Sequence, residues 1–288
     1  MARRAPTARQ RRLAQELRRL REERGLRQED VARELDWSLS KQEKIERAAI
    51  AVRVADVRAM LHLFGLSTSE HKQQYDAMVQ LTRDARVKGW WHAFGDAIPS
   101  WFESYVGLEA DASTLHTYAV QLIPGLLQTE NYARAVAQAV RPSLTADDVE
   151  AAVTARMERQ ARLAPPDPLD FWAVIDEAAL HRQIGGPSVM RAQLEHLAHL
   201  ASRSNATVQV LPFSTGAHAS MGTSFVILKF SEPTAPDIVY LEDLTSSAYL
   251  EEDPHISRYN VAFDHLRSAA LSDRESSQMI ARLARRMS

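Results

Sequence analysis

The sequence predicts two domains: an all-α bundle over residues 1–85, and a mixed α/β (α+β) domain over residues 88–288. The length of 288 residues exceeds what one hydrophobic core usually serves. Apolar residues recur at helical spacing near the N-terminus, whereas short β-branched and aromatic runs appear only later in the chain. The net charge also differs between the two parts of the chain. Residues 1–53 hold 15 Lys and Arg against 9 Asp and Glu, whereas the remainder is acidic.

Five short helices are expected in the first domain. The first covers residues 9–24 and stops at Gly25, which can take the left-handed position after a helix. The second covers Gln28–Leu35, the third covers Ser38–Arg47, and the sequence Ser67–Glu70 predicts a capping box for the fifth. Apolar residues three or four positions apart mark the buried faces: Leu13, Leu17, Leu20, Val31, Ala32, Leu35, Ile45, Val54, Val57, Leu61, Phe64, Tyr75, Met78 and Val79.

The second and third helices are separated only by a short turn at Asp36 and Trp37. Such a turn sets two helices at a steep angle, so that the second can enter a DNA major groove. Ser38 can cap that second helix with its hydroxyl. A basic end on an acidic body also fits a polyanionic partner. These features predict a helix-turn-helix that binds double-stranded DNA, with a degenerate, protein-binding helix-turn-helix as the alternative.

The stretch from Leu26 to Arg47 resembles the Cro/C1 (Xre) helix-turn-helix family. Three features carry the resemblance: Gln28 opening the second helix, Ala32 at the close helix contact, and the pair Ile45-Glu46 ending the third helix. Three positions depart from the usual pattern: Asp36 and Ala48, where glycine is common, and Gln42, where a β-branched core residue is common. Aspartate tolerates the left-handed backbone, but a glutamine in the core leaves the rotation of the third helix open.

This resemblance implies DNA contacts for seven residues. Gln28 would meet a phosphate or an adjacent base, and Lys41 and Arg47 would meet phosphates. Base edges would be contacted by Ser38, Leu39, Ser40 and Lys44. A flexible basic arm is expected from the Arg-rich start of the chain, with Arg3, Arg4, Arg9, Arg11 and Arg12.

The second domain is expected to contain four strands, at residues 171–175, 207–211, 225–230 and 238–241. Helices are expected after Ser113, after a cap at Thr129, from Thr145 to the prolines at 165–168, at 188–201, and from 254 to 286. The tryptophans Trp90, Trp91 and Trp101 are expected in the core or at a domain interface, because large aromatic side chains dominate packing.

Several stretches of this region resemble actinobacterial Cro/C1-type regulators with a C-terminal domain of unknown function, including WhiJ-like and antitoxin-like regulators. They are 90–91, 101–109, 123–134, 176–180, 210–213, 216–218 and 239–240, and the run Pro124-Gly-Leu-Leu-Gln-Thr129 is the most specific. The resemblance implies a transcriptional regulator whose C-terminal domain forms a homodimer and senses a small molecule or a protein. The alternative is an antitoxin-like interaction protein that binds a small cognate protein encoded nearby.

Motifs for catalysis or cofactors are missing from the sequence, so neither an enzyme nor a cofactor is expected. Zero cysteines exclude disulfides and thiolate metal ligands. Glu195, His196 and His199 share a helix but lack a further ligand at a fixed spacing, so no metal site is expected. Neither a signal peptide nor a membrane-spanning run is evident, and a cytoplasmic location is expected.

Two weaker candidates remain in the second domain. Asp176 and Glu177, with His181, could act as an acid/base pair at a strand end, but a cap for a following helix is favoured. The polar loop from Phe213 to Gly222 could line a pocket for an effector, with His218 and Thr223 as its candidate residues.

Overall fold

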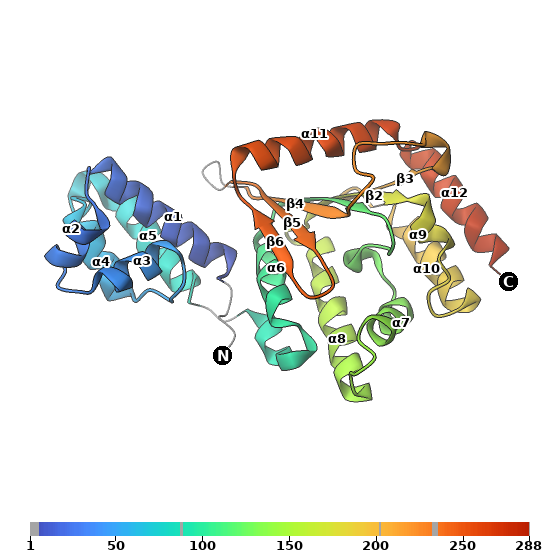
Figure 1. The fold of residues 1–288 in the computed structure, drawn as a ribbon, viewed down its shortest axis with the longest axis horizontal. Helices are drawn as coiled ribbons and strands as arrows, with labels where there is room; N and C mark the ends of the chain where they lie inside the picture. Colours follow the sequence, from blue (N-terminus) through green and yellow to red (C-terminus); the bar gives the residue numbers. More distant parts are fainter. Residues whose placement is uncertain (1–5, 87–88, 202, 232–235, 288) are drawn as a thin grey trace. The chain divides into compact units, whose positions relative to one another are not determined.

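The computed structural model describes residues 6–86, 89–201, 203–231 and 236–287 (Figure 1). Contacts divide the chain into two units, Met1–His92 and Ala93–Ser288. The first unit is helical and the second holds a six-stranded mixed sheet with helices, so the predicted fold class is confirmed. No helix among the described residues is long and apolar enough to cross a membrane.

Five α-helices build the first unit: α1 (Ala8–Glu23), α2 (Gln28–Glu34), α3 (Leu39–Glu46), α4 (Val54–Leu63) and α5 (Lys72–Asp84). They form around one apolar cluster that includes Leu17, Ile45 and Phe64, each with no exposed surface. Gly25 and Gly65 follow α1 and α4 with φ angles of 68° and 73°, in the left-handed region that stops a helix. The apolar residues that helical spacing predicts to be buried therefore form the core of this unit.

Two local predictions about the first unit are wrong. The segment before α5 has no capping box, because a 3-10 turn occupies Ser69–His71 and the Ser67 hydroxyl lies 2.9 Å from His62 Nδ1. The second concerns the basic arm, because three of its five arginines are helical. Arg9, Arg11 and Arg12 belong to α1, which starts early because Thr7 and Gln10 form a capping box. Arg3 and Arg4, the rest of that arm, lie outside the described residues.

The sheet of the second unit has the order β3-β2-β1-β4-β5-β6. Its strands are β1 (Thr114–Ala119), β2 (Asp170–Asp176), β3 (Ala206–Leu211), β4 (Phe225–Lys229), β5 (Ile238–Glu242) and β6 (Ser247–Leu250). β1, β2 and β3 are parallel, whereas β4 pairs antiparallel with β1 and β5. The four predicted strands are present. β1 stands where a helix was predicted after Ser113, and β6 was not predicted.

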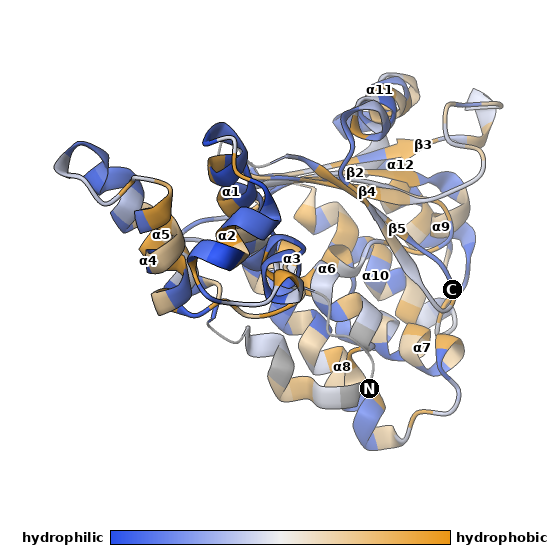
Figure 2. Cartoon of the chain, turned by 60° about the vertical axis from the view of Figure 1, so that its left-hand side comes forward, coloured by the Kyte–Doolittle hydropathy of each residue, from blue (hydrophilic) through white to orange (hydrophobic). Residues whose placement is uncertain are grey.

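Helices lie on both faces of this sheet (Figures 1 and 2): α11 on one, and α6 and α8 on the other. Their bounds are α6 (Ser100–Asp111), α7 (Glu130–Val140), α8 (Ala146–Arg159), α9 (Glu177–His181), α10 (Pro187–Leu200), α11 (Asp253–Ala269) and α12 (Asp273–Arg286). The predicted caps at Thr129 and Thr145 are confirmed. The helices predicted from 254 to 286 are α11 and α12, and Ser272 caps the second of them.

Candidate nucleic-acid interface

Helix α3 has a buried face and an exposed face. Gln42 and Ile45 are fully buried, whereas Ser40, Lys44 and Arg47 are exposed. The three exposed residues follow each other by four and three positions, so they share one side of the helix. α3 therefore presents a polar, partly cationic side to solvent, as a helix that reads a DNA groove must.

The start of α3 is also open to solvent. Ser38 caps the helix, with its Oγ accepting a hydrogen bond from the Lys41 amide at 3.2 Å. Leu39 retains 37% of its surface exposed, a large fraction for an apolar side chain. In helix-turn-helix proteins the N-terminal residues of the second helix contact base edges. Ser38, Leu39 and Ser40 occupy those positions.

Cationic side chains on this surface differ in how they are held. Lys44 and Arg47 form no ion pair with any residue that the structure describes, so their charges remain open to phosphates or bases. Lys41 is half-buried, with Nζ 2.9 Å from Asp56 Oδ1 and 3.8 Å from the centre of the Trp37 ring. A phosphate contact from Lys41 therefore requires it to leave Asp56.

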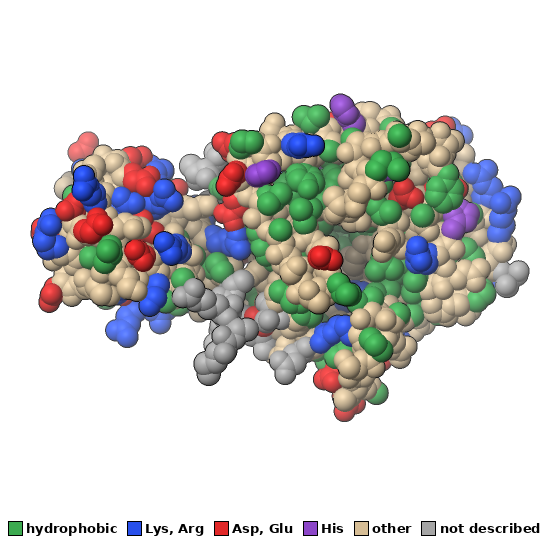
Figure 3. Space-filling model, viewed as in Figure 1, with side chains coloured by type: hydrophobic (Ala, Val, Ile, Leu, Met, Phe, Trp, Pro, Cys, Tyr) green, Lys and Arg blue, Asp and Glu red, His purple; other side chains and the backbone are tan. Residues whose placement is uncertain are grey.

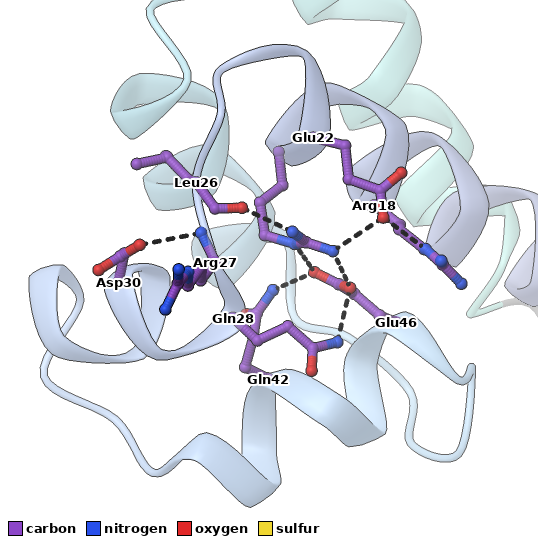
Figure 4. Close-up of polar contacts among 9 residues, drawn as sticks. Arg18, Glu22, Leu26, Arg27, Gln28, Asp30, Gln42 and Glu46 are labelled. Carbon is purple, nitrogen blue, oxygen red and sulfur yellow. Dashed lines mark hydrogen bonds and ion pairs between the residues drawn. The ribbon is translucent and has the colours of Figure 1, made fainter.

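The carboxylate of Glu46 fixes the base of α3 (Figure 4). Arg21 in α1 donates to both carboxylate oxygens, from Nε at 2.7 Å and from Nη2 at 2.9 Å. Gln28 in α2 donates from Nε2 at 2.7 Å, and Gln42 in α3 donates from Nε2 at 2.6 Å. The Arg21 and Glu46 side chains are only 9% and 3% exposed. This buried carboxylate thus ties α1 and α2 to α3.

These contacts explain two sequence positions. Gln42 stands where an apolar residue is usual. Its side chain can be buried there because its amide donates a hydrogen bond to Glu46. Gln28 was predicted to contact DNA, and one of its amide hydrogens is already used by Glu46. The second hydrogen of that amide can still reach a phosphate.

Both turns that flank α3 use the left-handed conformation. Asp36 has a φ angle of 52°, as the sequence predicts for its place in the turn. Ala48, immediately after Arg47, also has a φ angle of 52°, which is unfavourable for a residue with a Cβ atom. The Ala49 amide donates to the Lys44 carbonyl at 2.8 Å and closes the end of the helix. Ala48 thus adopts the left-handed backbone conformation that glycine commonly takes after this helix.

The interaction of Arg21 with Glu46 was missed in the sequence. The signal was present, because Arg21 lies four residues after Leu17 and continues the apolar stripe of α1. A charged residue at such a position needs a buried partner. The charge argument also needs refinement, since Figure 3 shows acidic and basic side chains mixed over the visible face of the first unit. The exposed cations Lys44 and Arg47 are therefore a local feature and not part of a uniformly basic face.

In the second unit, the favoured interpretation of Asp176 as a helix cap is correct. Asp176 Oδ1 accepts a hydrogen bond from the Ala178 amide at 2.9 Å at the start of α9. Glu177 Oε2 accepts from the Phe213 amide at 2.8 Å, and Glu177 Oε1 lies 3.2 Å from His181 Nε2. Both carboxylates thus hold the local backbone, Asp176 at the start of α9 and Glu177 at Phe213.

The two effector candidates lie in different surroundings. His218 Nε2 is 3.2 Å from the Tyr118 hydroxyl, which also lies 3.3 Å from Asp176 Oδ2. Burial raises the pKa of Tyr118, which keeps this hydroxyl protonated. Thr223 is exposed and donates to the Ser224 carbonyl at 3.0 Å. A shallow depression contains His218 but not Thr223, and its lining is Thr215, Ala217, His218, Ala219, His265 and Ala269.

The structure places the metal candidates Glu195, His196 and His199 on α10. Glu195 pairs with Arg191 at 3.0 Å on the exposed side of the helix. Burial, and then the neighbouring His199, lower the pKa of His196. Within the described residues, no group of three or more His, Cys, Asp and Glu could hold a metal ion.

Comparison with protein families gives two matches. A model described as a helix-turn-helix domain matches residues 12–73, which contain most of α1, all of α2 to α4, and Arg21, Lys44 and Glu46. A model described as a domain of unknown function (DUF5753) matches residues 102–282, more than half of the chain. No curated protein and no solved structure matches the chain. The first match confirms the helix-turn-helix predicted from the turn between α2 and α3.

Proposed function

The chain belongs to the DUF5753 family and carries a helix-turn-helix domain in front of the family domain, and from this premise we propose that it is a sequence-specific transcriptional regulator. In this proposal α3 is the recognition helix of a Cro/C1-type (Xre) unit. The observation that carries the proposal is the exposed side of α3, where Lys44 and Arg47 have no counter-ion among the described residues. No catalytic step is part of this function.

The chemistry of that side fits DNA. A lysine ammonium can donate to guanine O6 and N7, and a leucine can touch a thymine methyl group. Lys44 and Leu39 would make these contacts, while Ser38 and Ser40 would add hydrogen bonds to base edges. Arg47, at the end of α3, would bind phosphate and set the position of the helix along the groove. Specificity then comes from the first turn and Lys44, and affinity from Arg47.

The rest of the proposal concerns the second unit. A single helix-turn-helix reads one half-site, and specific binding at cellular salt usually needs two half-sites about one helical turn apart. The DUF5753 domain would supply the homodimer contact and would sense a small molecule or a protein in the cytoplasm. Its size supports a role beyond dimerisation, since mixed folds of this kind often hold pockets.

Selection of DNA from a random pool by the full chain tests the proposal. Enrichment of one sequence, with two related half-sites about one helical turn apart, is the expected result. The matched control is a chain with Ser40→Glu and Lys44→Glu, which places negative charge on the exposed side of α3 and away from its buried contacts. Failure of the wild-type chain to enrich any sequence at moderate salt, or equal enrichment by the control, would overturn the proposal.

A further inference from the structure

A second carboxylate is buried in the DUF5753 unit, and it is fully neutralised. Glu109 in α6 receives Nε of Arg159 at 2.7 Å and Nη2 at 2.8 Å. Both residues are almost completely buried. The rings of Phe102 and Tyr105 lie 5.0 and 5.4 Å from the Arg159 guanidinium carbon. This pair is a structural element, because all of its charge is matched in place.

Arg156, one turn before Arg159 in α8, is held differently. Its Nη1 donates to Gln128 Oε1 at 2.6 Å, and it forms no ion pair with any other described residue. Burial, and then the positive charge of Arg159, lower the pKa of Arg156 to about 10. A half-buried guanidinium without a counter-ion in contact is unfavourable by itself. Gln128 fixes one edge of the guanidinium, and the remaining N–H groups have no described acceptor.

Glu242 lies close enough to Arg156 for their charges to interact. This residue, at the end of β5, is exposed to solvent, and yet removal from bulk water raises its pKa. The Tyr240 hydroxyl donates to Glu242 Oε2 at 3.1 Å. Glu242 and Arg156 attract each other, but they are not within ion-pair distance.

Three tyrosine rings pack against one another beside Glu242. The ring centres of Tyr105 and Tyr240 are 4.4 Å apart, and those of Tyr240 and Tyr249 are 5.3 Å apart. Figure 3 shows the visible face of the second unit hollowed beside the place where Figure 1 draws the β5–β6 hairpin and α8. A pocket with aromatic walls and a few fixed polar groups is the usual form of a small-molecule site.

Three of the stretches that carry the family resemblance meet around Arg156 and Arg159. Glu109 and Tyr105 come from the stretch at 101–109, Gln128 from the Pro-Gly-Leu-Leu-Gln-Thr run, and Tyr240 from the pair at 239–240. Gln128 also donates to the Ile123 carbonyl at 2.7 Å, which holds the run in the shape that presents its amide to Arg156. The DNA-binding function uses none of these residues.

We propose that this concavity binds a small organic anion, and that Arg156 is the counter-ion of its carboxylate or phosphate group. A guanidinium offers two parallel N–H groups that match either oxyanion. Glu109 leaves Arg156 unpaired because it is already bound to Arg159. Removal from bulk water raises the pKa of Glu242, and its carboxyl group hydrogen-bonds to a polar group at the other end of the ligand. The site gives the sensing role proposed above a location and a ligand class.

Anion binding to the full chain, without DNA, tests this site. Thermal unfolding is followed while phosphate or acetate replaces chloride at constant ionic strength, for wild type, Arg156→Gln, Glu242→Gln and Arg191→Gln. Arg191 is an exposed arginine of the same unit, so its variant controls for the loss of one positive charge. A ligand that binds only the folded chain raises the midpoint in a saturable manner.

We expect at least one of the two anions to raise the midpoint of wild type and of Arg191→Gln, with the preferred anion identifying the ligand group. Arg156→Gln should bind that anion at least about tenfold more weakly than wild type does. Glu242→Gln should bind it as tightly as wild type or more tightly. Without added anion, Arg156→Gln should unfold no earlier than wild type, because it removes an unpaired charge. A purely structural Arg156 would instead lower the midpoint.

Equal responses of Arg156→Gln and wild type, or no saturable response of wild type to either anion, would overturn the inference. If Arg156→Gln does not fold, Arg156→Lys decides, since it keeps the charge but loses the planar fork and should bind the anion more weakly. The anion site itself does not depend on the proposed function, and only its role in regulating DNA binding rests on that function. Anion binding can fail while DNA selection succeeds, and the reverse, so the two failures are distinguishable.

Discussion

Arg21 and Glu46 form a buried two-point ion pair, with Nε 2.7 Å from Oε1 and Nη2 2.9 Å from Oε2. They come from α1 and from the last residue of α3, so the pair sets the orientation of the proposed recognition helix. Hydrogen bonds from Gln28 and Gln42 complete the shell of the carboxylate. The orientation of α3 therefore depends on charge as well as on the apolar core.

Glu46→Ala should destabilise the first unit by about 3–5 kcal/mol, because it leaves the Arg21 guanidinium buried without its partner. Amide hydrogen exchange by mass spectrometry on the full chain measures this unit separately from the second. Glu43→Ala is the control, since Glu43 lies on the same helix outside the buried pair. The double variant Arg21→Met, Glu46→Leu should recover much of the loss. Unchanged protection of α1 and α3 in Glu46→Ala would contradict the role given to the pair.

Lys44→Ala should weaken binding to the selected DNA sequence by about 1–3 kcal/mol and relax the preference at one base pair. The reason is the loss of the only ammonium on the first turns of the exposed side of α3 that has no described counter-ion. Fluorescence anisotropy with the selected site and its single-base variants measures both effects. Lys72→Ala, which removes an exposed lysine of α5, is the control. An unchanged base preference would remove Lys44 from direct readout.

Arg47→Ala should weaken binding to all DNA sequences alike, because a phosphate contact carries no sequence information. The slope of log K against log salt concentration should fall by about one, as expected for one phosphate contact. A salt titration of wild type and the variant on selected and unrelated DNA gives the slopes. A loss confined to the selected sequence would show that Arg47 reads a base instead.

His116 should make the second unit sensitive to acid. It stacks on Phe263, with ring centres 4.6 Å apart, and burial, followed by Lys229 and Arg267, lowers its pKa to about 4. The folded state keeps His116 neutral, whereas the unfolded chain takes up a proton near pH 6.5. Stability is therefore lost as the pH falls from about 6.5 to about 4, by at most about 3 kcal/mol.

His116→Phe should remove that part of the acid sensitivity while retaining the ring contact. Thermal unfolding at a series of pH values compares it with wild type and with His255→Gln, an exposed histidine of α11. We expect the gap between His116→Phe and wild type to widen as the pH falls. Parallel curves for these two proteins would assign the acid sensitivity to other groups.

The full chain should be a homodimer in the absence of DNA, since two half-sites must be bound together. Light scattering at micromolar concentration should give twice the chain mass of 32.3 kDa. Removal of residues 1–92 should leave the dimer intact if the second unit supplies the contact. A mass of one chain for both proteins would contradict the dimer proposal.

Local sequence signals predicted most of the architecture. The short interval between Gln28–Leu35 and Ser38–Arg47 was sufficient to predict the helix-turn-helix, and Thr129 and Thr145 cap the helices that they were expected to cap. Strands β2 to β5 were visible as β-branched and aromatic runs. β1 was missed because His116 and Thr117 interrupt its apolar pattern. Pairing with β2 and β4, rather than local preference, makes this segment a strand.

Some residues of the candidate sites could be predicted from the sequence, and others could not. The exposed side of α3 follows from helical spacing, so Ser40, Lys44 and Arg47 could be placed together from the sequence. The Arg21–Glu46 pair and the Arg156 concavity depend on contacts between distant segments. Glu109, Arg156 and Glu242 come from α6, α8 and β5, and spacing along the chain carries no information about their proximity.

The position of β1 in the sheet has a consequence for the order of events during synthesis. Thr114 pairs with Asp170 in β2 and with Lys229 in β4, so this strand emerges from the ribosome long before either neighbour. The helices of the first unit need only nearby partners and can form at once, since local contacts fold fastest. A nascent chain thus holds a finished helix-turn-helix while its sheet is still incomplete. Chaperones that protect unpaired strands would act on the second unit alone.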